Sequence, residues 1–167
     1  MLGKSTSPSP TIEDVFKEKL AGKNQQNALD FIAFLRKNEM SPKVADENCW
    51  TFSYSDGAEH VCVLCIYPDE DGIGWTIFDN PLTSKYDDFQ VDEKLKEFAL
   101  ANVKICAVSQ GLPCGCGNEP GRRKTVFGKV FDNVCTSEVG FRNPDDESLK
   151  KIMQMLDIWK LHIDTKL

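Results

Sequence analysis

Several features that mark particular classes of protein are missing from this 167-residue sequence. No apolar run approaches the roughly 20 residues that cross a bilayer, so we expect no membrane-spanning helix. Residues 1–10 are small and polar, with one lysine and no apolar segment, which is unlike a signal peptide. We therefore expect a cytoplasmic protein, in which residues 1–10 form a disordered tail and residues 11–167 form a single domain.

Residues typical of catalytic sites are also scarce. The two histidines are His60, at the start of a predicted strand, and His162, in the tail of the last predicted helix. Each histidine is better explained as a surface residue, or as a residue with its hydrogen bonds satisfied, than as a catalytic residue. Neither G-x-S-x-G nor H-E-x-x-H is present, and no glycine-rich stretch matches a P-loop or a dinucleotide fingerprint. The sequence names no catalytic residue and leaves open whether the chain is an enzyme.

Positive charge is in short supply, because the formal net charge is −6. This balance argues against nucleic-acid binding and against attraction to an acidic membrane surface. One segment differs: between residues 103 and 143 there are six basic residues and only three acidic ones. A local basic patch on an acidic protein is therefore expected, and most such patches are solvated surface. No partner protein or oligomeric state follows from the sequence.

Hydrophobic residues recur at helical spacing in four parts of the chain. Thr11 and Asp14 have the spacing of a capping box and predict the start of a short helix. Asn24 is expected to cap the second helix and Asn143 the last one, while the third should carry Cys106 on its apolar stripe. The predicted helices are residues 11–22, 24–37, 92–111 and from 143 onward.

A period of two residues marks the predicted strands. Asp56-Gly57 is a strong hairpin signal between the first two of them, whereas residues 38–48 are expected to be irregular. Three sequential strands with short turns predict an antiparallel meander. The pattern therefore indicates an α+β protein, with a three-strand meander plus one or two C-terminal strands packed against helices. The predicted strands are residues 50–54, 60–67, 73–77, 126–130 and 138–141.

Seven cysteines are present, an odd number with uneven spacing that suggests no disulfide framework. Thiols are normally kept reduced in the cytoplasm, so we interpret all seven as unpaired thiols or metal ligands. Four of them are spaced C-x7-C-x-C-x18-C, and tetrahedral zinc needs four ligands. Glycines and prolines between them allow sharp turns. The sequence therefore predicts a structural zinc site, closed to water, made by Cys106, Cys114, Cys116 and Cys135.

A second interpretation of the same segment is redox chemistry. Cys114 and Cys116 lie close to arginine residues in the sequence and could form a labile disulfide or act as a thiol sensor. Cys62 and Cys65 have C-x-x-C spacing but lie in a predicted strand, where residues three apart point to opposite faces. We therefore expect both to be core residues.

A third interpretation is a module that binds a small molecule or an anion. Aromatic residues of the predicted sheet could line an apolar cleft, although such residues are more often core. A nest of backbone N–H groups at residues 111–121, followed by basic side chains, could hold phosphate or carboxylate. The candidate ligand-binding residues are Trp50, Tyr54, Trp75, Arg122, Arg123 and Lys129.

Two segments resemble a family of uncharacterised small proteins from anaerobic bacteria. They are Thr125-Val-Phe-Gly-Lys-Val-Phe-Asp-Asn-Val-Cys135 and Val139-Gly-Phe-Arg-Asn-Pro-Asp145. The likeness covers roughly residues 28–156. It implies that Cys106, Cys114 and Cys135 belong to a shared pattern, in which Cys116 has a weaker place. The family provides no activity that could be carried over to this chain.

Overall fold

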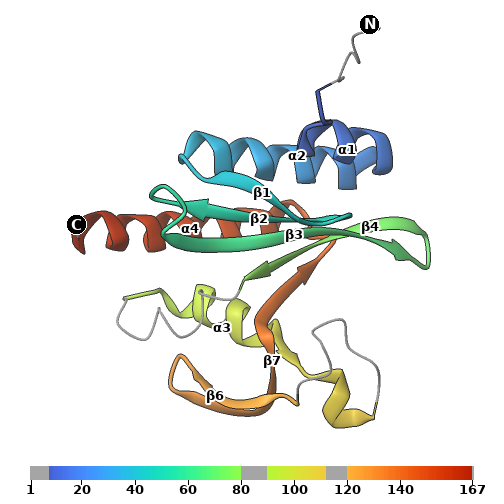
Figure 1. The fold of residues 1–167 in the computed structure, drawn as a ribbon. Coiled ribbons are helices and arrows are strands. Elements are labelled where there is room, and N and C mark those ends of the chain that lie inside the picture. Colours follow the sequence, from blue (N-terminus) through green and yellow to red (C-terminus); the bar gives the residue numbers. More distant parts are fainter. Residues whose placement is uncertain (1–7, 80–89, 112–119, 167) are drawn as a thin grey trace, which may run out of the picture.

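The computed structural model describes residues 8–79, 90–111 and 120–166, and every structural statement below concerns these residues. Within them the chain forms an α+β fold, as the sequence predicts (Figure 1). The helices are α1 (Ile12–Lys19), α2 (Gly22–Lys37), α3 (Glu93–Ala101) and α4 (Asp146–Lys166). The strands are β1 (Ser41–Asp46), β2 (Cys49–Tyr54), β3 (Glu59–Asp69), β4 (Gly72–Asp79), β5 (Val103–Ile105), β6 (Arg122–Val126) and β7 (Lys129–Arg142).

The strands form one antiparallel sheet in the order β1-β2-β3-β4-β7-β5, with β6 paired to β7. The expected meander is present and has a fourth strand, because β1 occupies part of the segment expected to be irregular. Most of β1 is exposed, and the side chain of Val44 is 66% exposed. An edge strand without a buried face shows no alternation of apolar and polar residues, so this alternation could not be used to predict β1.

Strand β7 is long and changes partners along its length. Its last residues, 138–142, pair with β4, while β6 pairs with residues 129–134 and β5 pairs with Val134 and Val139. Phe127 and Gly128 form the tight turn between β6 and β7 and both have positive φ, at 47° and 76°. Two successive positive φ values are the mark of a type I′ hairpin. The predicted strand at residues 126–130 is therefore wrong, because a turn lies in its middle.

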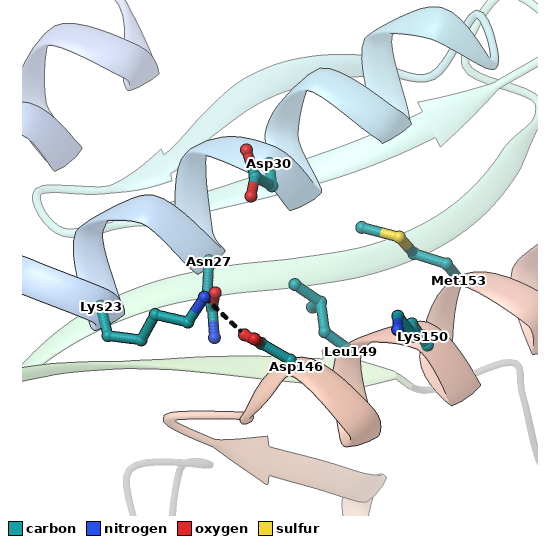
Figure 2. Close-up of a pocket in the computed structure, with 7 residues that line it drawn as sticks. All are labelled: Lys23, Asn27, Asp30, Asp146, Leu149, Lys150 and Met153. Carbon is teal, nitrogen blue, oxygen red and sulfur yellow. Dashed lines mark ion pairs between the residues drawn. The ribbon is translucent and has the colours of Figure 1, made fainter.

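Helices α1 and α2 lie together on one side of β1 to β3, and α3 and β6 lie farther along the sheet (Figure 1). Helix α2 also contacts the start of α4. The buried amide of Asn27 donates a hydrogen bond to the Pro144 carbonyl (3.1 Å), and Lys23 forms an ion pair with Asp146 (2.8 Å; Figure 2). These contacts join segments more than 100 residues apart in the chain.

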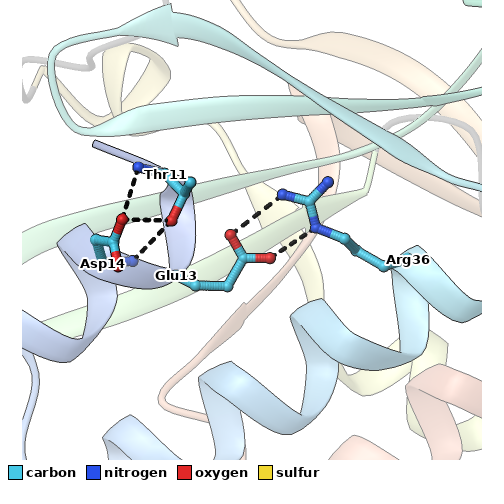
Figure 3. Close-up of polar contacts among 4 residues, drawn as sticks. All are labelled: Thr11, Glu13, Asp14 and Arg36. Atoms are coloured by element: carbon cyan, nitrogen blue, oxygen red, sulfur yellow. Dashed lines mark hydrogen bonds and ion pairs between the residues drawn. The ribbon is translucent and has the colours of Figure 1, made fainter. Parts of the chain in front are cut away.

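The predicted capping box of α1 is confirmed. Thr11 Oγ1 accepts a hydrogen bond from the Asp14 N–H, and the Asp14 carboxylate accepts one from the Thr11 N–H (Figure 3). Glu13, in the same turn, accepts two hydrogen bonds from Arg36 of α2, at 2.6 and 3.1 Å. The predicted cap at Asn24 is wrong, because α2 begins two residues earlier without a side-chain cap.

Two further helix boundaries differ from the prediction. Asp92 caps α3, but this helix ends at Ala101, so Cys106 lies beyond it, after β5. Asp145 rather than Asn143 caps α4 by accepting a hydrogen bond from the Ser148 N–H. The helical period continues past Ala101 in the sequence, but pairing between β5 and β7 overrides it.

The core lies between the sheet and the helices. One row of side chains crosses the sheet through Trp50, Leu64, Ile77 and Phe141, each at most 5% exposed. All four helices contribute side chains to the same cluster. Phe16 packs edge-on against Trp50, with ring centroids 5.5 Å apart. The inner face of the sheet is therefore covered by helices.

Candidate functional site

The cysteines of the predicted zinc site are only partly within the described residues. Cys106 directly follows β5, opposite Asn133 of β7, and its N–H donates to the Asn133 carbonyl (2.6 Å), whereas Cys135 lies two residues farther along β7. Neither cysteine is in a disulfide; Cys106 is 1% exposed and Cys135 is half-buried. The other two, Cys114 and Cys116, lie outside the described residues, as does most of the proposed N–H nest at residues 111–121.

Within residues 8–79, 90–111 and 120–166, no group of three or more His, Cys, Asp or Glu side chains is placed to hold a metal ion. Cys106 and Cys135 alone would supply only half of a tetrahedral zinc shell. The zinc site, and any role of zinc as a cofactor, therefore stays a prediction from the sequence.

Of the aromatic candidates, Trp50 and Trp75 are core residues, and only Tyr54 borders a small surface hollow, with Glu39, Ser55 and Asp56. Trp50 and Trp75 are 5% and 0% exposed, and both rings pack against Phe16 of α1. Tyr54 lies nearer the surface, where its hydroxyl donates a hydrogen bond to Asp164 (2.6 Å) and its ring packs edge-on against Trp159. That carboxylate raises the pKa of the Tyr54 hydroxyl, and desolvation adds to the shift. The rings act in packing.

The cationic candidates lie elsewhere in the sheet. Arg122, Arg123 and Lys129 belong to the hairpin of β6 and β7, and three strands separate β6 from β2. Arg123 forms a 3.6 Å ion pair with Asp132, and the Lys129 ammonium lies 5.2 Å from the Phe131 ring centroid. The structure therefore does not bring the buried aromatic rings and these cations together in one site.

A disulfide joins Cys49 of β2 to Cys65 of β3, and we call it the sheet disulfide. The two residues are direct partners across the strands, with Cα atoms 4.2 Å apart. The interpretation of all seven cysteines as unpaired thiols or metal ligands is therefore wrong for this pair. The expectation that Cys65 is core is also wrong, whereas Cys62 is fully buried as expected.

Strand geometry explains why these two cysteines meet. The Asn48 carbonyl accepts a hydrogen bond from the Ile66 N–H (2.9 Å), so the neighbouring pair, Cys49 and Cys65, is a non-hydrogen-bonded pair. At such pairs of an antiparallel ladder the Cα atoms and side chains approach most closely. Two cysteines placed there can form a disulfide without moving the strands.

The sheet disulfide belongs to a row of residues that faces away from the core. Successive residues of a strand point to opposite faces, and the row Cys49, Cys65, Thr76 and Arg142 lies beside the buried row that contains Trp50. Both cysteines are half-buried. They are therefore on the outer face of the sheet, opposite the face that the helices cover.

Arg142 gives this outer row a positive charge. Its guanidinium lies 4.3 Å from the centroid of the Tyr67 ring, a cation–π contact. Tyr67 is two residues from Cys65 on the same strand and therefore shares its face. Desolvation raises the pKa of the Tyr67 hydroxyl, whereas Thr76 and Arg142 act in the opposite direction. Arg142 therefore places one positive charge on the same face as the sheet disulfide, two strands away from Cys65.

Comparisons with known proteins add no assignment to this geometry. No family model matches the chain, and no curated protein or solved structure matches it either. The resemblance to small proteins from anaerobic bacteria therefore stays an expectation. In the described parts of the chain, no helix has both the length and the apolar character needed to cross a bilayer.

Proposed function

We propose that this protein is a thiol–disulfide redox protein in which Cys49 and Cys65 cycle between a disulfide and a pair of thiols. The observation that carries the proposal is their placement as direct partners on adjacent strands, half-buried on the outer face of the sheet. This is the redox class expected from the sequence, assigned to a different pair of cysteines from Cys114 and Cys116.

The position of the pair favours reversible chemistry over a purely structural role. Strands β2 and β3 are already joined by a short turn and a ladder of hydrogen bonds, and the main core lies on the other face. Opening the disulfide therefore leaves the strands held together. The two thiols would stay side by side, so the disulfide can form again without a search for the partner.

The reaction consumes two thiols of a reductant, either two glutathione-type monothiols or one dithiol. One reductant thiolate attacks a sulfur of the sheet disulfide and forms a mixed disulfide, and the other cysteine leaves as a thiolate that takes up a proton. The second reductant thiolate then breaks the mixed disulfide. Two electrons reach the protein, which ends with two thiols, and the reductant ends as a disulfide.

This proposal is tested by cycling the protein between reduced and oxidised glutathione, with alkylation and peptide mass spectrometry to locate each thiol. Reduced glutathione at millimolar concentration should release two thiols, at Cys49 and Cys65, and oxidised glutathione should remove them again. The far-ultraviolet circular dichroism should stay unchanged throughout. A Cys135→Ser variant is the matched control and should cycle like the wild type.

Two outcomes would contradict the proposal. One is a sheet disulfide that millimolar glutathione leaves intact in folded protein, which would identify it as a structural link. The other is loss of the folded state on reduction, because a protein that unfolds in one redox state cannot cycle.

A zinc site in the segment 106–135 is a second candidate function, as a structural role. It is favoured by the pairing of β5 with β7, which leaves Cys106, at the end of β5, and Cys135, on β7, within a few residues of one another across the sheet. The test is elemental analysis of protein purified without chelator, on wild type and on a Cys106→Ser, Cys135→Ser double variant. About one zinc per chain in the wild type and none in the variant would support it, and metal-free wild type would contradict it.

A further inference from the structure

A cavity of about 270 Å³ lies between α2 and α4, away from the sheet disulfide (Figure 2). Its wall carries two lysines and two aspartates together with apolar side chains. It is smaller than the pockets that hold drug-sized ligands. A space of this size, open to solvent on one side, suits a small molecule on the scale of a single amino acid.

One charge of each sign in the wall is not used by an ion pair. Lys150 of α4 and Asp30 of α2 line the cavity, and neither has an ion-pair partner within 4 Å among the described residues, while Lys150 lies near enough to Asp146 to help lower the pKa of that carboxyl. Asp30 accepts one hydrogen bond, from Gln26 (2.7 Å), and keeps further acceptor capacity. The cavity therefore offers a cation on one helix and an anion on the other.

The other two charged residues of the wall form an ion pair with each other and are exposed to solvent. Lys23 and Asp146 form their 2.8 Å ion pair with side chains 66% and 59% exposed. An exposed pair of this kind contributes little to stability and can rearrange around a ligand. Lys23 therefore can add a second donor to an incoming carboxylate.

The rest of the wall is mainly apolar, and Asn27 holds together the two helices that form it. Leu149 is 5% exposed, and the half-buried thioether of Met153 points along the wall from the next turn of α4 (Figure 2). Methionine adapts its shape to irregular apolar groups. Asn27, 3% exposed, ties α2 to the chain before α4 through its bond to Pro144. The two helices are therefore fixed on either side of the cavity before any ligand binds.

We propose that this cavity binds a small zwitterion with an apolar side chain, that is, an apolar α-amino acid. The ligand ammonium lies against Asp30, its carboxylate against Lys150 and Lys23, and its side chain on Leu149 and Met153. A molecule with one charge would use only one of the two exposed charges, Asp30 or Lys150. This inference does not depend on the redox proposal.

The test is isothermal titration calorimetry of the full chain with L-leucine and two probes that each lack one charge. These are 4-methylpentanoate, which lacks the ammonium, and 3-methylbutylamine, which lacks the carboxylate. Leucine should bind saturably at one site, and each probe should bind at least tenfold more weakly. Glycine, which lacks the apolar side chain, should also bind at least tenfold more weakly.

Variants locate the binding. Asp30→Asn and Lys150→Gln should each weaken leucine binding at least tenfold, and Met153→Trp should abolish it by filling the cavity. Lys94→Gln, at an exposed lysine of α3, is the matched control and should leave affinity unchanged. Circular dichroism checks that each variant folds.

Three results would overturn the proposal. They are the absence of saturable leucine binding, equal binding of leucine and 4-methylpentanoate, and unchanged affinity in both the Asp30 and Lys150 variants. The second result would identify a simple carboxylate site, and the third would place the ligand elsewhere on the protein.

Discussion

Cys65, Thr76 and Arg142 stand in one row across β3, β4 and β7, on the face of the sheet opposite the core. Tyr67 holds the Arg142 guanidinium over this face through the contact of its ring. Arginine stays charged at every physiological pH, so the field it provides does not depend on pH. Arg142 therefore supplies a constant positive charge to the face that carries the sheet disulfide, two strands away from Cys65.

Removing that charge should slow the chemistry of the reduced cysteines. We expect Arg142→Met to lower the rate at which iodoacetamide alkylates Cys65 at neutral pH by about threefold, because less of the thiol is ionised. Arg142→Lys keeps the charge and should restore most of the rate. Equal rates in wild type and Arg142→Met, measured by mass spectrometry of the reduced proteins, would show that Arg142 does not act on the cysteines.

Removing the disulfide itself should cost stability without loss of the fold. The cysteines are 16 residues apart, and closing a loop of about this length stabilises a protein by about 3 kcal/mol. The Cys49→Ser, Cys65→Ser double variant should therefore unfold about 3 kcal/mol more easily than oxidised wild type. Urea denaturation of oxidised wild type, reduced wild type and the variant measures this, with the last two expected to agree.

At the scale of elements, the ion pair between α1 and α2 gives stability that depends on pH. Hydrogen bonds from Arg36 hold the pKa of the Glu13 carboxyl below its ordinary value, although burial acts the other way. A lowered folded-state pKa means that the contribution is full above the ordinary pKa of a glutamate and is lost as pH falls through the folded-state value.

We therefore expect Glu13→Gln to be less stable than wild type at pH 7 and equally stable at pH 2. Urea denaturation at both pH values measures the difference. The matched control is Glu93→Gln, which removes the exposed ion pair with Lys96 on α3 and should change stability little at either pH. A Glu13 effect that persists unchanged at pH 2 would contradict the assignment to charge.

The junction between β7 and α4 depends on Asn143. Its side-chain carbonyl accepts a hydrogen bond from the Trp75 N–H (2.9 Å), and its Nδ2 donates to Asp69 (2.8 Å). Its φ of 42° lies in the left-handed region, which asparagine tolerates better than most residues. Asn143 therefore determines both the direction of the chain between β7 and α4 and the hydrogen bond to Trp75 of β4.

Replacing Asn143 should separate these two roles. Asn143→Ala loses both hydrogen bonds and keeps the strained φ, so it should lower the free energy of unfolding by about 2–3 kcal/mol. Asn143→Gly relieves the backbone strain but loses the same bonds, so it should cost less than the alanine variant. Thermal and urea unfolding measure both, and an alanine variant as stable as the glycine variant would contradict this account.

At the scale of the whole molecule, the sequence predicts those parts of the fold that have a local signal. The capping-box spacing at Thr11 correctly predicts the start of α1. The alternation that includes Trp50 and Phe52 correctly predicts strand β2. Strand β1 and the end of α3 were missed because exposure and long-range pairing, rather than local pattern, determine them.

The sheet disulfide was missed for a specific reason. Near the turn, Tyr54 pairs with Glu59, and continuing that register would place Cys49 opposite Leu64. An irregularity after Phe52 shifts the register by one residue, so that Cys49 meets Cys65 instead. A one-residue shift moves every side chain to the other face, and bulges of this kind leave no clear mark in the sequence.

The disulfide also bears on the cellular setting. A cytoplasmic location is our expectation from the sequence, and disulfides in that compartment are usually transient, catalytic or redox-sensing. A disulfide that reports on the thiol pool fits this expectation better than a permanent link does. The cavity between α2 and α4 would give the same domain a second input from a small molecule.

The midpoint potential of the sheet disulfide tests the central claim most directly. Folded protein is equilibrated in buffers of graded dithiol-to-disulfide ratio, and the fraction of Cys49 and Cys65 alkylated is measured at each potential. Our account predicts a two-electron transition above about −300 mV, within reach of cellular thiols. A transition well below about −300 mV, where structural disulfides lie, would contradict it.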